Sequence, residues 1–140
     1  MAIGLLLHML AKILLQRAGQ YPSPPGWPEW PGLEVAGVIR TAPAGSRWKP
    51  GDAVCALLGG GGYAQQAAVP ENLVLPVPRG LSMAEAAAIP EAFATSYLNL
   101  CLEGGLKKGD TVLIQAGASG LGMAAIQLVK QFGGTVVTTV

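Results

Sequence analysis

Seven consecutive residues in the last third of the chain, all but one of them small, have the composition of an anion-binding turn: Ala116, Gly117, Ala118, Ser119, Gly120, Leu121 and Gly122. A dinucleotide pyrophosphate requires a tight turn between strand and helix, a close approach of the backbone, and free amides at the helix N-terminus. Gly122 takes the place of the third glycine in the usual GxGxxG pattern, where the helix packs on the strand. We expect these seven residues to bind the pyrophosphate of a dinucleotide.

The segments on either side of this turn predict a βαβ unit. Thr111 to Gln115 is a short apolar run of the kind buried on both faces of a parallel sheet, and a helix over residues 123–132 and a second strand over residues 135–140 follow. A tight turn without a ligand is the alternative, and this context favours the dinucleotide site. A six-stranded doubly wound sheet needs on the order of 100 further residues, so the chain is expected to be a fragment that ends near the residue choosing between NAD and NADP.

The first ninety residues predict a compact, barrel-like β unit, with strands over residues 33–41, 53–58, 63–69 and 73–75. A helix that ends near Arg17, at Gly19, precedes them and is followed by a rigid loop with five prolines. Four consecutive glycines at 59–62 predict a mobile loop.

The composition changes after this region towards helices. Ser82 and Glu85 have the spacing of a capping box, which predicts the start of a helix. Pro90 interrupts that helix, and a second helical segment is expected over residues 91–102.

The composition also argues against several classes of function. The net charge is +1 and 12% of the residues are charged, which argues against a nucleic-acid or membrane surface. Cys55 and Cys101 form no CxxC pair and the single histidine, His8, cannot build a metal site alone, so we expect no disulfide scaffold, no metal and a cytoplasmic location. The apolar residues 1–15 are short for a membrane span and lack the features of a signal peptide, so a buried helix is favoured over export or insertion.

Four stretches of the sequence together resemble one known family. Lys107 to Val140, KKGDTVLIQAGASGLGMAAIQLVKQFGGTVVTTV, is similar to the start of the cofactor domain in zinc-independent medium-chain dehydrogenases/reductases of the quinone oxidoreductase branch. Residues 14–26, 31–39 and 86–100 agree with that family. The resemblance implies an α/β plus β fold, with an incomplete, β-rich GroES-like substrate domain over residues 1–90 and the first βαβ of a truncated Rossmann doubly wound domain over residues 91–140.

The resemblance also implies NADPH-dependent reduction of quinones or related conjugated carbonyls by a protein that is commonly a homodimer. In that family the threonine at the position of Thr95 lies near the nicotinamide, and the tyrosine at the position of Tyr21 lies at the substrate cleft. Tyr21 could donate a hydrogen bond or proton to the reduced substrate, or it is a loop aromatic packed among prolines, and the sequence leaves both open. Zinc-dependent relatives have a histidine where this chain has Leu33, so an enzyme that uses NADP(H) without zinc is implied.

The chain departs from the family pattern before Leu14. Relatives have an asparagine and, three residues later, an aspartate where this chain has Leu10 and Ile13. The asparagine is a cleft residue in relatives, so its replacement by leucine removes a polar group from the expected site. A non-catalytic or inactive nucleotide-binding fragment therefore stands as the alternative to an NADPH-dependent enzyme.

Overall fold

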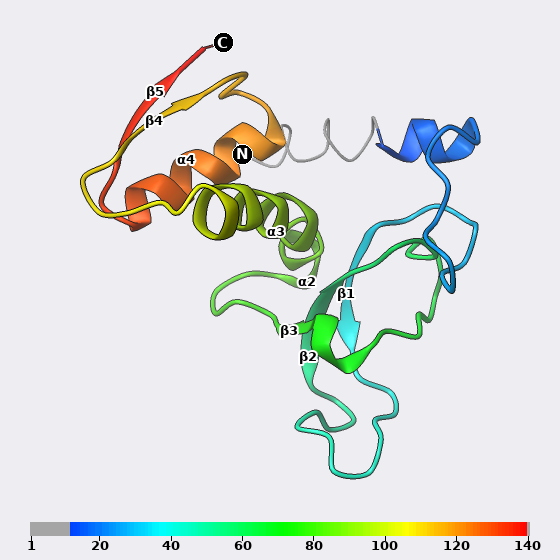
Figure 1. Ribbon diagram of the computed structural model, residues 1–140. Helices are drawn as coiled ribbons and strands as arrows, with labels where there is room; N and C mark the ends of the chain where they lie inside the picture. Colours follow the sequence, from blue (N-terminus) through cyan, green and yellow to red (C-terminus); the bar gives the residue numbers. More distant parts are fainter. Residues whose placement is uncertain (1–11, 140) are drawn as a thin grey trace. The chain divides into compact units, whose positions relative to one another are not determined.

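The computed structural model describes residues 12–139 of the 140-residue chain. Within them the chain forms two compact units, which adjoin in sequence between Pro90 and Glu91. The first unit is built on an antiparallel sheet, and the second on a parallel pair of strands with helices (Figure 1). The functional division into a substrate domain, 1–90, and a cofactor domain, 91–140, stays a prediction.

Three strands form the sheet of the first unit, in the order β1-β2-β3. β1 (Glu34–Val38) and β3 (Val74–Pro76) each pair antiparallel with β2 (Ala53–Leu57), and a short 3-10 helix, η1 (Glu71–Leu73), precedes β3. Three consecutive residues of β2 are buried: Val54, Cys55 and Ala56. Because successive side chains of a strand point to opposite faces, both faces of β2 are covered. These strands confirm three of the four that the sequence predicted, although β1 ends earlier than expected.

The fourth expected strand, over residues 63–69, is wrong. These residues have no strand partner in the described part of the chain and are mostly exposed. The stretch contains three alanines and two glutamines, and therefore offers little of the β-branched or aromatic surface that a sheet buries. The β unit described here is a three-stranded sheet rather than the expected barrel-like arrangement.

The four glycines 59–62, expected to form a mobile loop, instead pack against the proline-rich loop. A Cβ on Gly59 would lie 2.6 Å from the ring of Trp27. Gly61 N donates to Trp30 O over 2.8 Å, and the indole Nε1 of Trp30 returns a hydrogen bond to Gly61 O over 3.2 Å. Larger side chains would not fit at this junction, so the glycines here allow close packing.

Residues 12–17 are helical, and the helix ends where the sequence predicted. Gln20 N donates to Leu15 O over 2.9 Å and Gly19 N to Gln16 O over 3.0 Å, which are the two bonds of a Schellman motif. The expected first half of this helix lies outside the described residues.

The predicted capping box at Ser82 is confirmed. Ser82 Oγ accepts from Glu85 N over 3.3 Å, and the Glu85 carboxylate accepts from Ser82 N over 2.8 Å. Together these two bonds satisfy amides that would otherwise be without a partner, and they begin α2 (Met83–Ala86).

The second helical segment is also confirmed. α3 (Pro90–Tyr97) has its proline in the first turn, where the helix needs no amide donor. It continues without a break into a π-helical segment, η2 (Leu98–Glu103), so the helical path covers the expected residues 91–102.

Two turns of the same design each precede a strand. Asp52 N donates to Lys49 O over 3.1 Å, and Asp110 N to Lys107 O over 3.2 Å. In each turn the aspartate side chain also accepts from the lysine amide, over 2.8 Å and 2.7 Å. The glycine between them has a φ of 96° in the first turn and 90° in the second, as the third position of a type II turn requires.

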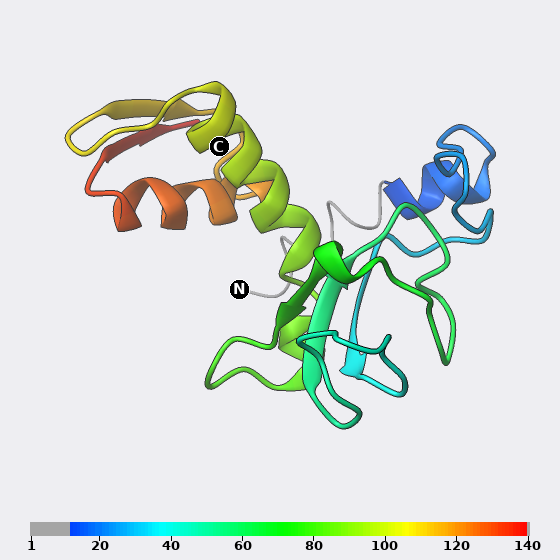
Figure 2. The ribbon, with the colours of Figure 1, turned by 60° about the horizontal axis from the view of Figure 1, so that its bottom comes forward.

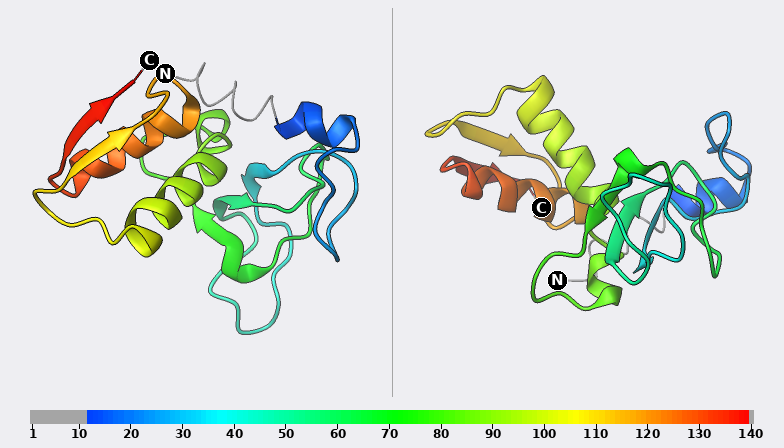
Figure 3. Two further views of the ribbon diagram at one scale, coloured as in Figure 1. Left: turned by 45° about the horizontal axis from the view of Figure 1, so that its top comes forward. Right: turned by 90° about the horizontal axis from the view of Figure 1, so that it is seen from below.

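The second unit has the predicted βαβ arrangement. β4 (Thr111–Ile114) and β5 (Thr135–Thr138) pair in parallel. α4 (Gly120–Gln131) joins them and lies along one face of the pair (Figures 2 and 3). The core between the helix and the strands is formed by Ile114, Ala125 and Val129.

The expectation that the first strand of this unit is buried on both faces is wrong for the described residues. Ile114 is 8% exposed, whereas Leu113 is 63% exposed and its paired residue Val137 is 52% exposed. Because successive residues of a strand point to opposite faces, α4 covers one set and leaves the other uncovered. The apolar residues of β4 predicted that it pairs in parallel with β5. They did not predict which face of the strand is covered.

Candidate functional site

The seven-residue turn follows β4 and bends at Ala116. The φ of Ala116 is 53°, in the left-handed region that residues with a Cβ seldom adopt. Gly117 is buried against the end of β5, where any Cβ would meet the side chain of Thr138. Gly122 is equally enclosed, since its Cβ would lie 2.8 Å from the Cα of Gly117. The turn therefore has the close backbone contacts that a dinucleotide-binding turn requires.

Ser119 is the N-cap of α4. Its Oγ accepts from Gly122 N over 3.0 Å, and its carbonyl accepts from Met123 N over 2.8 Å. Serine suits this position because its hydroxyl satisfies an amide that has no carbonyl partner in the helix. The cap places the first turn of the helix at Gly120, so the start expected at Met123 is wrong.

The hydrogen bonds of the turn leave three of its backbone amides without an acceptor. Thr139 accepts from two amides, that of Ala116 at Oγ1 and that of Gly117 at its carbonyl. The amides of Ser119 and Gly122 are used within the turn itself. Within the turn, the amides that have no acceptor among the described residues are those of Ala118, Gly120 and Leu121.

These free amides lie at or just before the N-terminus of a 12-residue helix. The helix dipole makes this end partially positive, and unpaired amides there bind anions. The first turn of the helix has no acidic residue to compete with a phosphate. A dinucleotide pyrophosphate fits these groups, since they supply its three requirements: a tight turn, a close backbone and amide donors.

Thr95 belongs to the same unit as the turn. It lies in α3 and is partly exposed, and its carbonyl accepts from the side chain of Asn99 over 2.7 Å. The next residue, Ser96, is 2% exposed, and its Oγ donates to the carbonyl of Leu121 over 3.3 Å. Ser96 was not among the predicted site residues, and it links α3 directly to the first turn of α4.

Tyr21 belongs to the first unit, in the loop that follows the helix of residues 12–17. Its side chain is 38% exposed, and the Lys12 ammonium lies 5.9 Å from the centre of its ring. This contact fits a cation–π interaction. A proton donor and a loop aromatic are both compatible with it, so the catalytic role of Tyr21 stays a prediction.

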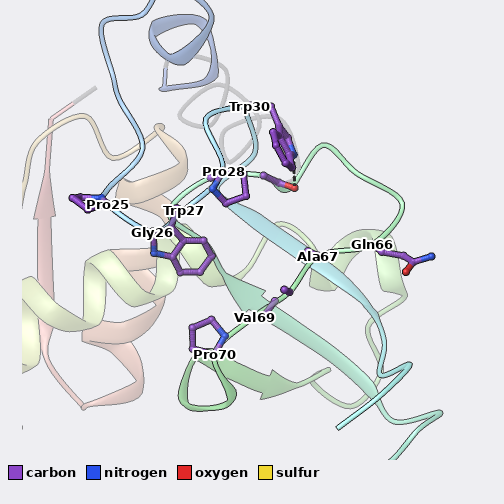
Figure 4. A pocket seen from close by; sticks show the side chains of 12 residues that line it. Pro25, Gly26, Trp27, Pro28, Trp30, Gln66, Ala67, Val69 and Pro70 are labelled. Carbon is purple, nitrogen blue, oxygen red and sulfur yellow. Dashed lines mark hydrogen bonds between the residues drawn. The ribbon is translucent and has the colours of Figure 1, made fainter. Parts of the chain in front are cut away.

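A hollow of about 670 Å³ opens on the first unit beside the four glycines (Figure 4). Its walls are mainly apolar and include Trp27, Trp30 and Pro70, and no titratable side chain lines it. Acid–base chemistry therefore has no group to act through in this hollow.

Cys55 and Cys101 differ in their surroundings. Burial, followed by the nearby Glu34 carboxylate, raises the pKa of the Cys55 thiol, so this thiol is a poor nucleophile. Both cysteines are free. Among residues 12–139 no three histidine, cysteine or acidic side chains group where they could hold a metal ion, and no helix has the length and hydropathy of a membrane span.

Comparison with known proteins agrees with the fold of both units. Residues 9–79 match the alcohol dehydrogenase GroES-like domain family. The chain is 45% identical over 109 residues to the phenolphthiocerol synthesis polyketide synthase type I Pks15/1 of Mycobacterium bovis, covering 77% of this chain and 5% of that protein.

Two solved structures extend the likeness into the second unit. The quinone oxidoreductase of Thermus thermophilus, also solved with NADPH, superposes with a TM-score of 0.71 and 38% identity, covering 91% of this chain and 40% of that one. CurK enoyl reductase superposes with a TM-score of 0.72 and 33% identity, covering 78% and 33%. This chain thus spans less than half of each protein, and it belongs to the alcohol dehydrogenase GroES-like domain family, among the quinone oxidoreductases and enoyl reductases of the medium-chain dehydrogenases/reductases.

Proposed function

We propose that the protein is an NADP(H)-dependent oxidoreductase, and that residues 116–122 bind the cofactor's pyrophosphate. The observation that carries this proposal is the set of three free amides at the N-terminus of α4. The structure solved with NADPH is that of a relative with the same fold, which supports NADPH over NADH. When bound, the cofactor supplies the hydride, and the protein positions it and stabilises the charge that develops on the substrate.

The residues of this chain divide that work between them. The turn holds the pyrophosphate, while Thr95, on the helix that Ser96 links to α4, contacts the nicotinamide. Tyr21 donates a hydrogen bond or a proton to the oxygen of the reduced substrate, since a neutral phenol can polarise a carbonyl. No zinc is needed in this scheme.

The proposed substrate is a small, electron-poor conjugated carbonyl, and two classes fit. A quinone is supported by the likeness to the quinone oxidoreductase of Thermus thermophilus. An enoyl compound is supported by CurK enoyl reductase and by the higher identity to a polyketide synthase. NADPH oxidation by the full-length protein with a benzoquinone and with a crotonyl thioester distinguishes them, and turnover of neither favours the non-catalytic alternative.

Ile13, one of the two departures from the family pattern, is 7% exposed. It is a buried packing residue on the helix of residues 12–17. The other departure, Leu10, lies outside the described residues.

We further propose that the protein is a cytoplasmic homodimer. Size-exclusion chromatography with light scattering of the full-length protein tests whether it is a dimer.

Two substitutions at one position test the pyrophosphate site. Gly120→Pro removes one free amide, and the residue before it already suits proline because Ser119 has φ −72° and ψ 161°. Proline is also favoured as the first residue of a helix. Gly120→Ala is the matched control, since it adds a Cβ and keeps the amide.

We expect Gly120→Pro to bind NADPH about 10- to 100-fold more weakly than Gly120→Ala, the loss of one hydrogen bond to a charged group. Isothermal titration of the full-length variants measures both affinities, and circular dichroism checks that both keep their helix content. Equal NADPH affinity in two folded variants would show that the amide of Gly120 does not contact the cofactor.

A further inference from the structure

The Thr139 side chain takes a hydrogen bond that a regular sheet would give to its own carbonyl. Thr139 N donates to Ile114 O over 3.1 Å, which continues the parallel ladder past the end of β5. In a regular ladder the next bond would run from Ala116 N to Thr139 O. Instead Ala116 N donates to Thr139 Oγ1 over 3.1 Å, and Thr139 O accepts from Gly117 N over 2.9 Å.

The hydroxyl therefore inserts one residue into the pairing between the two chain segments. The inserted residue is Ala116, whose φ of 53° is strained for a residue with a Cβ. A neighbouring bond stabilises the same arrangement, because Thr138 Oγ1 donates to Ile114 O over 2.9 Å. From this offset the chain turns away from the sheet and presents the next amides at the start of α4.

We propose that Thr139 is a positioning residue for the dinucleotide turn, whose hydroxyl holds the offset that places the free amides for the pyrophosphate. This role rests on the function proposed above. Without the hydroxyl, Ala116 N can return to Thr139 O and restore the regular ladder. Gly117 and the residues after it would then shift by one position, and the free amides would move with them.

Two variants separate the hydroxyl from the rest of the side chain. Thr139→Val removes the hydroxyl and keeps the branched shape, whereas Thr139→Ser keeps the hydroxyl. In the full-length protein we expect Thr139→Val to weaken NADPH binding about tenfold and Thr139→Ser to weaken it less than about twofold. Thr139 is exposed, so neither change creates a buried cavity.

A second substitution tests the mechanism. Ala116→Gly, added to Thr139→Val, should restore most of the NADPH affinity, because glycine keeps a positive φ without the help of the hydroxyl. Isothermal titration of the wild type, Thr139→Val, Ala116→Gly and this double variant measures the coupling. Failure of Ala116→Gly to restore binding would contradict the link between the hydroxyl and the strained residue.

Amide hydrogen exchange gives a reading that needs no cofactor. The Gly117 amide should exchange faster in Thr139→Val than in Thr139→Ser, because Ala116 N takes over its acceptor, Thr139 O, when the hydroxyl is missing. Equal exchange, or equal NADPH affinity of these two variants, would overturn the positioning role. Absence of NADPH binding to the wild type, with the expected difference in exchange, would overturn the proposed function and leave the structural part of the role standing.

Discussion

The two glycine-rich segments of the molecule look alike in sequence and differ in structure. In residues 59–62 the glycines let the chain pass close to Trp27 and to the proline-rich loop. In residues 116–122 Gly117 and Gly122 also serve close packing, against Thr138 and against the turn itself. The second segment differs because a capped helix follows it and three amides there remain free.

Glycine density alone therefore does not mark a ligand site. A glycine can be required because a Cβ would collide with the protein, as at Gly59. A binding turn needs, in addition, donors that the protein leaves unused. In this chain the N-cap at Ser119 and the pairing with Thr139 decide which donors those are.

The largest effect is expected where a charge enters the second segment. Gly122→Asp would crowd the turn and place a carboxylate at the helix N-terminus, where it repels phosphate, so NADPH affinity should fall at least about 100-fold. Titration of the full-length variant with NADPH measures it. Gly37→Asp is the control, because it makes the same charge change at a glycine whose φ is not positive and where a Cβ meets nothing within 4 Å. NADPH affinity that is unchanged in Gly122→Asp would defeat the assignment of the turn.

An intermediate effect is expected in the first segment. A Cβ on Gly60 would collide with Pro28 O and the side chain of Ser23, so Gly60→Ala should lower the free energy of unfolding by about 1–3 kcal/mol. All three tryptophans, Trp27, Trp30 and Trp48, lie in that unit, so their fluorescence during urea unfolding reports on it.

The same substitution should leave the second unit unchanged. Labelling by a thiol reagent checks this, since Cys55 lies in the first unit and Cys101 in the second. Gly60→Ala should speed labelling of Cys55 and not of Cys101. The raised pKa of Cys55 acts in the same direction, because the fold keeps this thiol protonated and unreactive at a pH near the ordinary value of 9.0, where an unfolded cysteine ionises. Equal acceleration of labelling at both cysteines would mean that the two units do not unfold independently.

The smallest effect is expected at the capping box. It belongs to neither glycine-rich segment, so a change there shows how large an effect is when neither segment is altered. Hydrogen bonds from the amide and then the hydroxyl of Ser82 lower the pKa of Glu85 below its ordinary value of 4.5. A lowered pKa means that the carboxylate stabilises the fold above that pH and that this contribution disappears as the pH falls through the lowered value. Glu85→Gln should therefore lower the thermal midpoint slightly at about pH 7, and the difference should shrink towards about pH 3. A difference that persists in acid would point to packing instead of charge.

Local signals were the most predictable part of the fold. The capping box at Ser82, the end of the first described helix at Gly19 and the βαβ order around the turn all follow from residues close together in sequence. Each depends on a side chain or glycine acting within a few residues, so spacing alone predicts it.

The parts that failed depend on contacts between distant residues. Residues 63–69 have no strand to pair with in the described part of the chain, and their own sequence does not reveal this. The packing of Gly59 depends on Trp27, and the offset at Ala116 on Thr139, neither of which a local pattern reveals. The same holds for the buried Ser96, whose partner is the carbonyl of Leu121. Spacing could place the candidate turn but could not say which of its amides are free.

The paired turns at Lys49 and Lys107 have a consequence for how the chain folds. Each closes over four residues with one backbone bond and one side-chain bond, so each forms from sequence neighbours before any distant contact exists. One fixes the start of β2 and the other the start of β4. Each unit thus has one turn that needs no distant contact, so we expect the first unit to begin folding while the second is still being made.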